Sequence, residues 1–191
     1  MKSKQDIYYK LTDKDGRTYG GCQWGPGVTN KAPGKGELCT NGWIHLYTDP
    51  LLAVLLNSIH GNFKPDEMLL WTATAKGRIK SDHGLKVGAQ VVTILEQIPL
   101  PEITLEQKIR FAILCAKSVY EEKKFNKWAD DWLSGKDRTA SAAGAARAAS
   151  AARAPASAAW AARAASAAAS AAGKDIDLIM LAHQAVEGAE G

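Results

Sequence analysis

Residues Leu38–Leu56 read LCTNGWIHLYTDPLLAVLL, and this stretch decides the fold that we expect for the first half of the chain. The Asn-Gly pair within it is a turn signal, because both residue types tolerate a positive φ. The next five residues, Trp43–Tyr47, alternate as a half-buried strand does, so Trp43, His45 and Tyr47 share one face. A strand that follows directly on a turn is therefore predicted here.

The same stretch also predicts the start of a helix. Asp49 is suited to capping the first turn, and Pro50 at the first helical position lacks only an N–H that would have no partner there. Apolar residues continue from Leu51 to Leu56, and we expect a helix over 50–58. The stretch is thus a strand-to-helix corner.

Further strands are predicted from β-branched and alternating runs around this corner. They lie at Ile7–Leu11, Arg17–Trp24, Met68–Ala75, Arg78–Lys80 and Gln90–Ile98. The first two are expected to form a hairpin, Lys76-Gly77 is expected to turn the chain, and Gly25–Gly36 is expected to be an exposed loop. Residues 1–100 therefore predict an α+β domain with a small mixed β-sheet and one short helix.

Residues 101–137 are expected to form helices that pack on this domain. Thr104 and Gln107 make a capping box, and apolar residues then recur at helical spacing to about residue 122. A second apolar period begins near Phe125, and Ser134-Gly135 supplies a stop signal.

Residues 138–191 form an alanine-rich extension with a period of three. Alanine is the best helix former, so we expect helix interrupted near Pro155 and ended by Gly173. After Pro155, one side of the helix is expected to hold the larger residues Trp160, Arg163, Ser166 and Ser170. The opposite alanine face suits close helix packing and predicts a homo-oligomer, although a tolerated spacer is the alternative. Asp175 is expected to cap a last helix.

Composition narrows the class of protein. The formal net charge is +4, from 24 basic and 20 acidic residues, which by itself is too small to argue for nucleic acid, and we do not expect nucleic acid as a partner. The chain has three cysteines, and no apolar signal region follows the polar start Met1–Asp6, so we expect a cytoplasmic protein. No window of the sequence is apolar enough for a membrane span.

The corner also carries a family resemblance. The pattern Leu-Cys-x-Asn-Gly-aromatic-x-His-x-x-x-Asp-Pro-Leu begins at Leu38, with Tyr8-Tyr9-Lys10 before it and a strand-Gly-strand unit at Leu70–Ile79 after it. Together these motifs resemble an uncharacterised domain family of phages, prophages and bacteria, over roughly residues 5–100. The resemblance implies the cytoplasm of the host cell and a role in counter-defence or in binding a host factor.

A second resemblance covers the start of the extension. The segment Trp128-x-x-x-Trp132-Leu-Ser-Gly-Lys-Asp-Arg138, running into alanine triplets, is similar to alanine-rich helical segments of immunity proteins. It implies helix there and no particular activity.

Cys39 and His45 are candidates for a nucleophile and base pair, because a thiol needs a neighbouring imidazole or positive field to react as thiolate. The alternative is a buried cysteine and a structural histidine bonded to the backbone. A zinc site would draw on Cys22, Cys39, His45 and His60 or His83. Because these residues lack Cys-x-x-Cys or His-x-x-x-His spacing, we predict no metal site and no cofactor.

Aromatic and basic residues near the corner suggest a pocket for a small, planar, anionic ligand such as a nucleotide, held by stacking and by cations. The candidate binding residues are Arg17, Trp24, Cys39, Trp43, His45 and Tyr47, with Lys31 and Lys35 nearby. The alternative is core packing of the tryptophans and ordinary solvated lysines. We therefore expect a non-enzymatic binding module.

The alternative function is an ADP-ribosyltransferase-like enzyme that uses a nicotinamide nucleotide. Trp43–Leu56 is similar to the strand-and-helix segment that lines the nicotinamide pocket of that family. The resemblance implies that Tyr8 or His45 holds the ligand and that Glu96 or Glu102 is the acid. The family's glycine-rich pattern and clear glutamate motif are missing from this chain.

Overall fold

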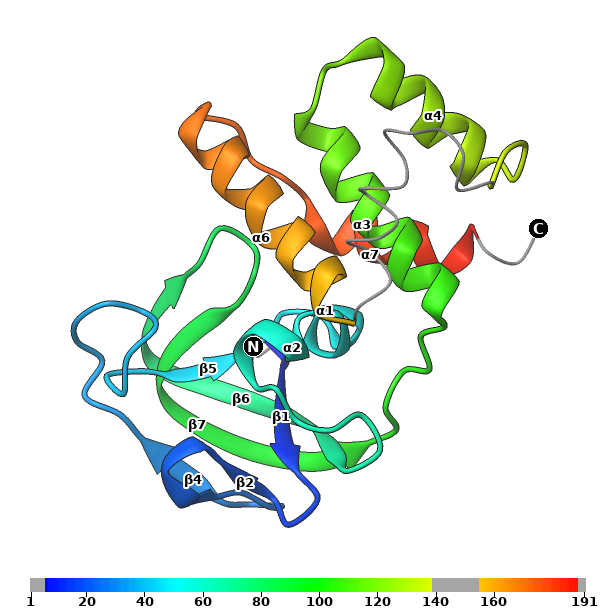
Figure 1. The fold of residues 1–191 in the computed structure, drawn as a ribbon. Coiled ribbons are helices and arrows are strands. Elements are labelled where there is room, and N and C mark those ends of the chain that lie inside the picture. Colours follow the sequence, from blue (N-terminus) through cyan, green and yellow to red (C-terminus); the bar gives the residue numbers. More distant parts are fainter. Residues whose placement is uncertain (1–5, 139–154, 189–191) are drawn as a thin grey trace, which may run out of the picture. The chain divides into compact units, whose positions relative to one another are not determined.

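The computed structural model describes residues 6–138 and 155–188, and it divides the chain into two compact units, Met1–Pro101 and Glu102–Gly191 (Figure 1). Most of the alanine triplets lie at 139–154, outside the described residues. None of the helices within the described ranges has the length and apolar character needed to cross a membrane.

The first unit is built on one long antiparallel pair, β6 (Met68–Ser81) with β7 (Val87–Ile98). β1 (Tyr8–Asp13) adds to β6, whereas β4 (Thr29–Lys31) and β5 (Ile44–Leu46) both add to β7. A second sheet joins β2 (Arg17–Thr18) to β3 (Cys22–Gln23) across the 3-10 turn η1 (Tyr19–Gly21). The helices α1 (Pro50–Leu55) and α2 (Asn57–His60) complete the unit. The predicted α+β class is confirmed, and each of these strand pairings is antiparallel.

The strand-to-helix corner forms as its local signals predict. The Asp49 carboxylate accepts hydrogen bonds from the N–H groups of Leu51, at 2.8 Å, and Leu52, at 3.3 Å, with Pro50 opening α1. These contacts satisfy N–H groups that the first turn would otherwise leave without partners. The expected helix over 50–58 is divided, because Leu56 has φ −94° and ψ 0° between α1 and α2.

The predicted hairpin between Ile7–Leu11 and Arg17–Trp24 is wrong. β1 pairs with β6, in a register that sets Lys10 opposite Trp71. The 17–24 segment instead folds back on itself, because Gly20 and Gly21 adopt φ values of 76° and 73° that favour glycine. Residues 25–36 are likewise not all loop, since β4 lies within them.

The turn expected at Lys76-Gly77 is a β-bulge inside a continuous strand. β6 runs through Gly77, which has a φ of 80°, and its register on β7 shifts between Lys76 and Ile79. One extra residue there bends the strand without ending it. The turn between β6 and β7 is formed by residues 82–86, after the end of β6 at Ser81 and before the start of β7 at Val87.

The core of the first unit is apolar and aromatic. Its buried cluster draws on β5, β6, β7 and the segment after β3, and it comprises Trp24, Leu46, Trp71, Ala73, Val87, Ala89, Val92 and Ile94. Leu46 and Ala73 are fully buried. Since side chains alternate along a strand, His45 leaves β5 on the face opposite to Leu46.

The second unit is helical and is organised around α3 (Leu105–Val119). The capping box of Thr104 and Gln107 is present at its start. α4 (Lys123–Leu133), α6 (Pro155–Ala171) and α7 (Leu178–Glu187) all contact α3. Polar side chains of α3 bond the last carbonyls of two neighbours: Arg110 donates to Leu133 O at 2.9 Å, and Gln107 donates to Val186 O at 3.3 Å.

The alanine face of α6 is buried, as the residues Ala158, Ala159, Ala162, Ala165 and Ala169 show. Trp160, Arg163 and Ser170 lie on the exposed side, as expected. Ser166 does not, because only 2% of it is exposed. A period of three lags a helical turn by about 60° at each step, so the second step from Trp160 already reaches the alanine face.

The cap of α7 is Asp177 and not Asp175. The Asp177 carboxylate accepts a hydrogen bond from Met180 N at 2.9 Å, and the helix begins at Leu178. The two residues before Asp177 are outside the helix, which places Asp175 too early to reach the first turn.

We expect Asp177→Ala to lower the free energy of unfolding by about 1 kcal/mol, because it removes the only side-chain cap recorded for α7. Asp175→Ala is the matched control and should change stability by less than about 0.3 kcal/mol. Urea denaturation followed by circular dichroism measures both. Equal losses in the two variants would contradict the assignment of the cap.

Candidate functional site

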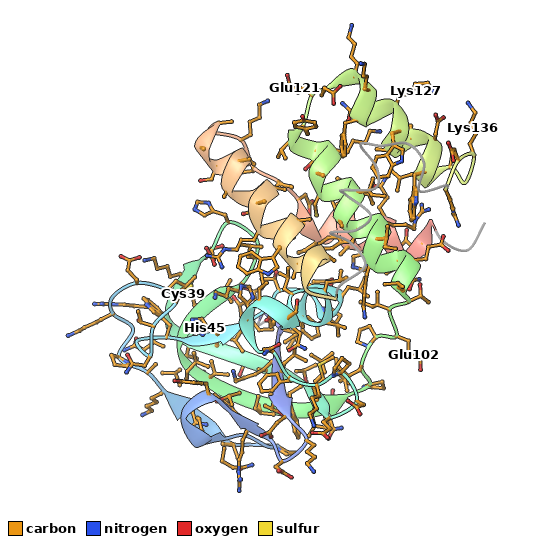
Figure 2. All side chains as sticks on the ribbon, viewed as in Figure 1. Cys39, His45, Glu102, Glu121, Lys127 and Lys136 are labelled. Carbon is orange, nitrogen blue, oxygen red and sulfur yellow. The ribbon has the colours of Figure 1, made fainter. Side chains whose placement is uncertain are left out.

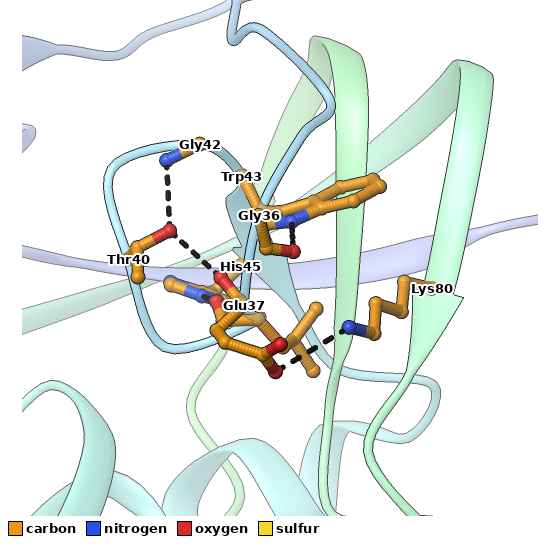
Figure 3. Close-up of polar contacts among 8 residues, drawn as sticks. Gly36, Glu37, Thr40, Gly42, Trp43, His45 and Lys80 are labelled. Carbon is orange, nitrogen blue, oxygen red and sulfur yellow. Dashed lines mark hydrogen bonds and ion pairs between the residues drawn. The ribbon is translucent and has the colours of Figure 1, made fainter.

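The 36–42 loop, Gly36–Gly42, is held against β5 by the two rings that the sequence singled out (Figure 3). The Trp43 indole N–H donates to Gly36 O at 3.1 Å, and His45 Nε2 is hydrogen-bonded to Leu38 O. Since a carbonyl only accepts, Nε2 carries the proton of this imidazole. Both rings therefore fix backbone carbonyls of the loop in place.

A glycine closes the same loop. A Cβ added to Gly42 would lie 2.0 Å from Lys35 O, a distance that no side chain can occupy. Gly42 N also bonds the Thr40 hydroxyl at 3.2 Å, and this hydroxyl in turn donates to Glu37 O at 2.7 Å. The loop path thus depends on the Asn-Gly pair that marked the turn.

The surroundings of His45 favour the neutral form of its imidazole. Burial of its half-buried ring holds its pKa below the usual value, and the ammonium groups of Lys86 and Lys10 act in the same direction. The hydrogen bond to Leu38 and the Asp82 carboxylate oppose the shift without reversing it.

Lys86, the residue before β7, contacts the 36–42 loop. Its side chain is buried, with 6% of the residue exposed, and Nζ lies 3.4 Å from Cys39 Sγ. Cys39 itself is exposed at the surface of the loop (Figure 2). The buried ammonium group of Lys86 is therefore in contact with the solvent-exposed thiol of Cys39. A thiol sulfur is a weak hydrogen-bond acceptor, so this contact compensates the positive charge poorly.

Lys10 is a second buried lysine, also 6% exposed. Its Nζ donates to the carbonyl of His45 at 3.1 Å and lies 4.6 Å from the centre of the Trp24 ring. Burial lowers its pKa to about 8, and only the field of Cys22 opposes that shift. None of the ion pairs recorded between described residues involves Lys10 or Lys86.

The six predicted binding residues do not form one group. Trp43 and His45 lie together beside Cys39 at the 36–42 loop. Trp24 instead joins the core cluster with Leu46, on the other face of β5, and its indole donates to the Thr18 hydroxyl at 2.9 Å.

The remaining two predicted residues sit apart from the loop contacts. Arg17 is exposed on β2, where its Nε bonds Gln23 at 3.3 Å. Tyr47 is buried, and its hydroxyl lies 3.3 Å from His60 Nδ1. Burial raises the pKa of this phenol, so it stays protonated over the physiological range.

Lys10 and Lys86 are the residues that sequence reasoning missed. One signal for Lys10 is its place two residues after Tyr8 in the predicted strand Ile7–Leu11, which puts a cation on the face of an aromatic residue. Lys86 has no comparable signal, because its burial comes from the loop that folds over it.

The alternatives for the corner are constrained by these contacts. His45 is bonded to the backbone through Nε2, as the structural reading of this histidine expects, whereas Cys39 is exposed and contacts Lys86. In the described part of the chain, no three metal-binding side chains of His, Cys, Asp or Glu gather closely enough to hold an ion.

The residues named for a nicotinamide site are also separated. Tyr8 packs against the core cluster, whereas the His45 ring lies on the opposite face of β5. Glu96 is exposed on β7, and Glu102 belongs to the second unit.

No protein-family model, curated protein or solved structure matches this chain.

We expect Lys10 to make stability depend on pH. Its pKa is about 8 in the folded protein against 10.5 as the ordinary value, so below pH 8 both states carry the proton and the burial penalty is fully present. Between pH 8 and 10.5 the unfolded state binds more protons, and stability rises with pH by up to about 1.4 kcal/mol per unit.

Urea denaturation between pH 7 and 10 measures this effect as the difference between the wild type and Lys10→Met. The exposed Lys64→Met is the control and should keep the wild-type slope. Parallel curves for the wild type and Lys10→Met would show that the buried ammonium has an ordinary pKa.

Proposed function

We propose that the first unit is a non-enzymatic binding module that holds a small anionic ligand, of the nucleotide or free phosphate class, at the anion corner. This corner is formed by Cys39, His45 and Lys86. The observation that carries the proposal is the buried Lys86 ammonium, whose recorded contact is a thiol sulfur.

Electrostatics supports an anion at this place. A buried ammonium group without a carboxylate partner is costly, and an anion would offset that cost with a charge-assisted hydrogen bond. The positive field of Lys86 and Lys10 reaches His45 and disfavours a further positive charge there. A negative ligand would experience the same field as attraction.

The protonation and contacts of His45 favour binding over catalysis. Because Nε2 of this ring donates to Leu38 O, Nδ1 is the nitrogen that could act as a general base, and among the described residues no hydrogen bond joins it to the Cys39 thiol. The ADP-ribosyltransferase-like alternative gains no support from the geometry, because Tyr8 and His45 lie on opposite faces of β5.

Counter-defence, or binding of a host factor, follows from the phage resemblance alone. The proposed homo-oligomer needs a surface other than the alanine face of α6, since the alanines of that face are already buried and α6 packs against α3. The surface that we propose for it is the exposed side of α6, where the Arg163 guanidinium lies 5.2 Å from the centre of the Trp160 ring.

We expect phosphate, ADP or ATP to stabilise the full chain in thermal shift assays and to bind in titration calorimetry. Lys86→Met should weaken binding about tenfold or more, because it removes a charge-assisted hydrogen bond. Lys64→Met, at an exposed site in the same unit, should bind as the wild type does. Circular dichroism confirms that each variant is folded.

A second readout tests the location. A bound anion at this corner should slow alkylation of Cys39 by iodoacetamide in the wild type. If no anion stabilises the chain, or if Lys86→Met binds normally, the anion corner is not a site. Release of nicotinamide from NAD that is lost in His45→Ala or Glu96→Ala would favour the enzyme instead.

A further inference from the structure

A second concentration of positive charge lies along the outer half of β6 and on the segments beside it. Five exposed basic residues make up what we call the basic arm: Lys31, Lys35, Lys76, Arg78 and Lys80. They are distant in the sequence and come together only through strand pairing and loop contacts.

Strand register brings the first two together. Lys31 of β4 and Lys76 of β6 are both directly opposite Val91 of β7, on its two sides. Residues directly opposite in antiparallel strands share a face. With strands about 4.8 Å apart, the two lysine Cα atoms lie about 10 Å from each other on that face.

Contacts with the loop before β5 bring Lys35, Arg78 and Lys80 into the same region. Arg78 donates to Gly34 O at 3.5 Å, which sets the guanidinium beside the neighbour of Lys35. Lys80 lies 3.7 Å from the Glu37 carboxylate, which itself is 90% exposed (Figure 3). One exposed ion pair of this kind is weak, so the arm keeps most of its positive field.

We propose that the basic arm docks the phosphate backbone of duplex nucleic acid without reading its sequence. A row of cations on a β surface complements the repeating charge of a duplex, and phosphate contacts of lysine and arginine carry no base specificity. Binding of single strands would call for exposed aromatic rings, whereas the nearby Trp43 is buried and bonded to Gly36 O.

This surface is independent of the anion corner. Lys86 is buried and belongs to the corner, whereas each residue of the arm is exposed. Loss of ligand binding in Lys86→Met and loss of duplex binding in an arm variant are therefore separate results.

The test uses the full chain and a fluorescein-labelled duplex DNA of about 20 base pairs, with fluorescence anisotropy measured from about 50 to 200 mM salt. The double variant Lys31→Gln/Lys76→Gln should weaken binding at least about tenfold and lower the salt slope by about 2. The matched control, Lys14→Gln/Lys64→Gln, removes the same net charge from exposed sites of the same unit and should bind nearly as the wild type does.

Glu37→Gln tests the sign of the effect. Because the Glu37 carboxylate competes with phosphate for Lys80, its removal should tighten duplex binding by a few fold. Several results would overturn the proposal: no duplex binding at low salt, equal losses in the two double variants, or tighter binding of a single strand or of poly-glutamate than of the duplex.

Discussion

The antiparallel ladder between β6 and β7 is the constraint on which the first unit depends. These strands have 14 and 12 residues, whereas β4 and β5 have three each and are too short to persist alone. β4 and β5 both pair with β7, and the 36–42 loop lies in the segment of chain between these two short strands. The geometry of both charged surfaces therefore follows from one long pairing, which the bulge at Gly77 bends.

Local signals made part of this fold predictable. The cap at Asp49, the capping box at Thr104 and the corner after Asn41-Gly42 each involve hydrogen bonds within a few residues, so the sequence contains both partners of every contact. The partner of β1 was not predictable in the same way. Residues 7–11 are compatible with a neighbour at 17–24 and with a distant strand, and only the shared core favours β6.

In the candidate site, too, the residues placed by local structure were predictable, and those placed by tertiary packing were not. Trp43, His45 and Cys39 are close in sequence and come together, since one turn and one strand place them. Trp24 goes to the opposite face, because that position follows from packing against Leu46 and not from any neighbour in sequence. The burial of Lys86 has no local signal either, since it arises from the 36–42 loop, whose Cys39 thiol lies 3.4 Å from its Nζ.

The net charge of +4 conceals two different uses of cations. A buried ammonium group is poorly screened by salt and acts strongly over a short range, which suits a small ligand with one or two negative charges. Exposed cations are individually weak and are screened by salt, yet a row of them gains affinity from each counterion that a polyanion releases. The two kinds of cation meet at the 36–42 loop, because the buried Lys86 contacts Cys39 and the exposed Lys80 pairs with Glu37.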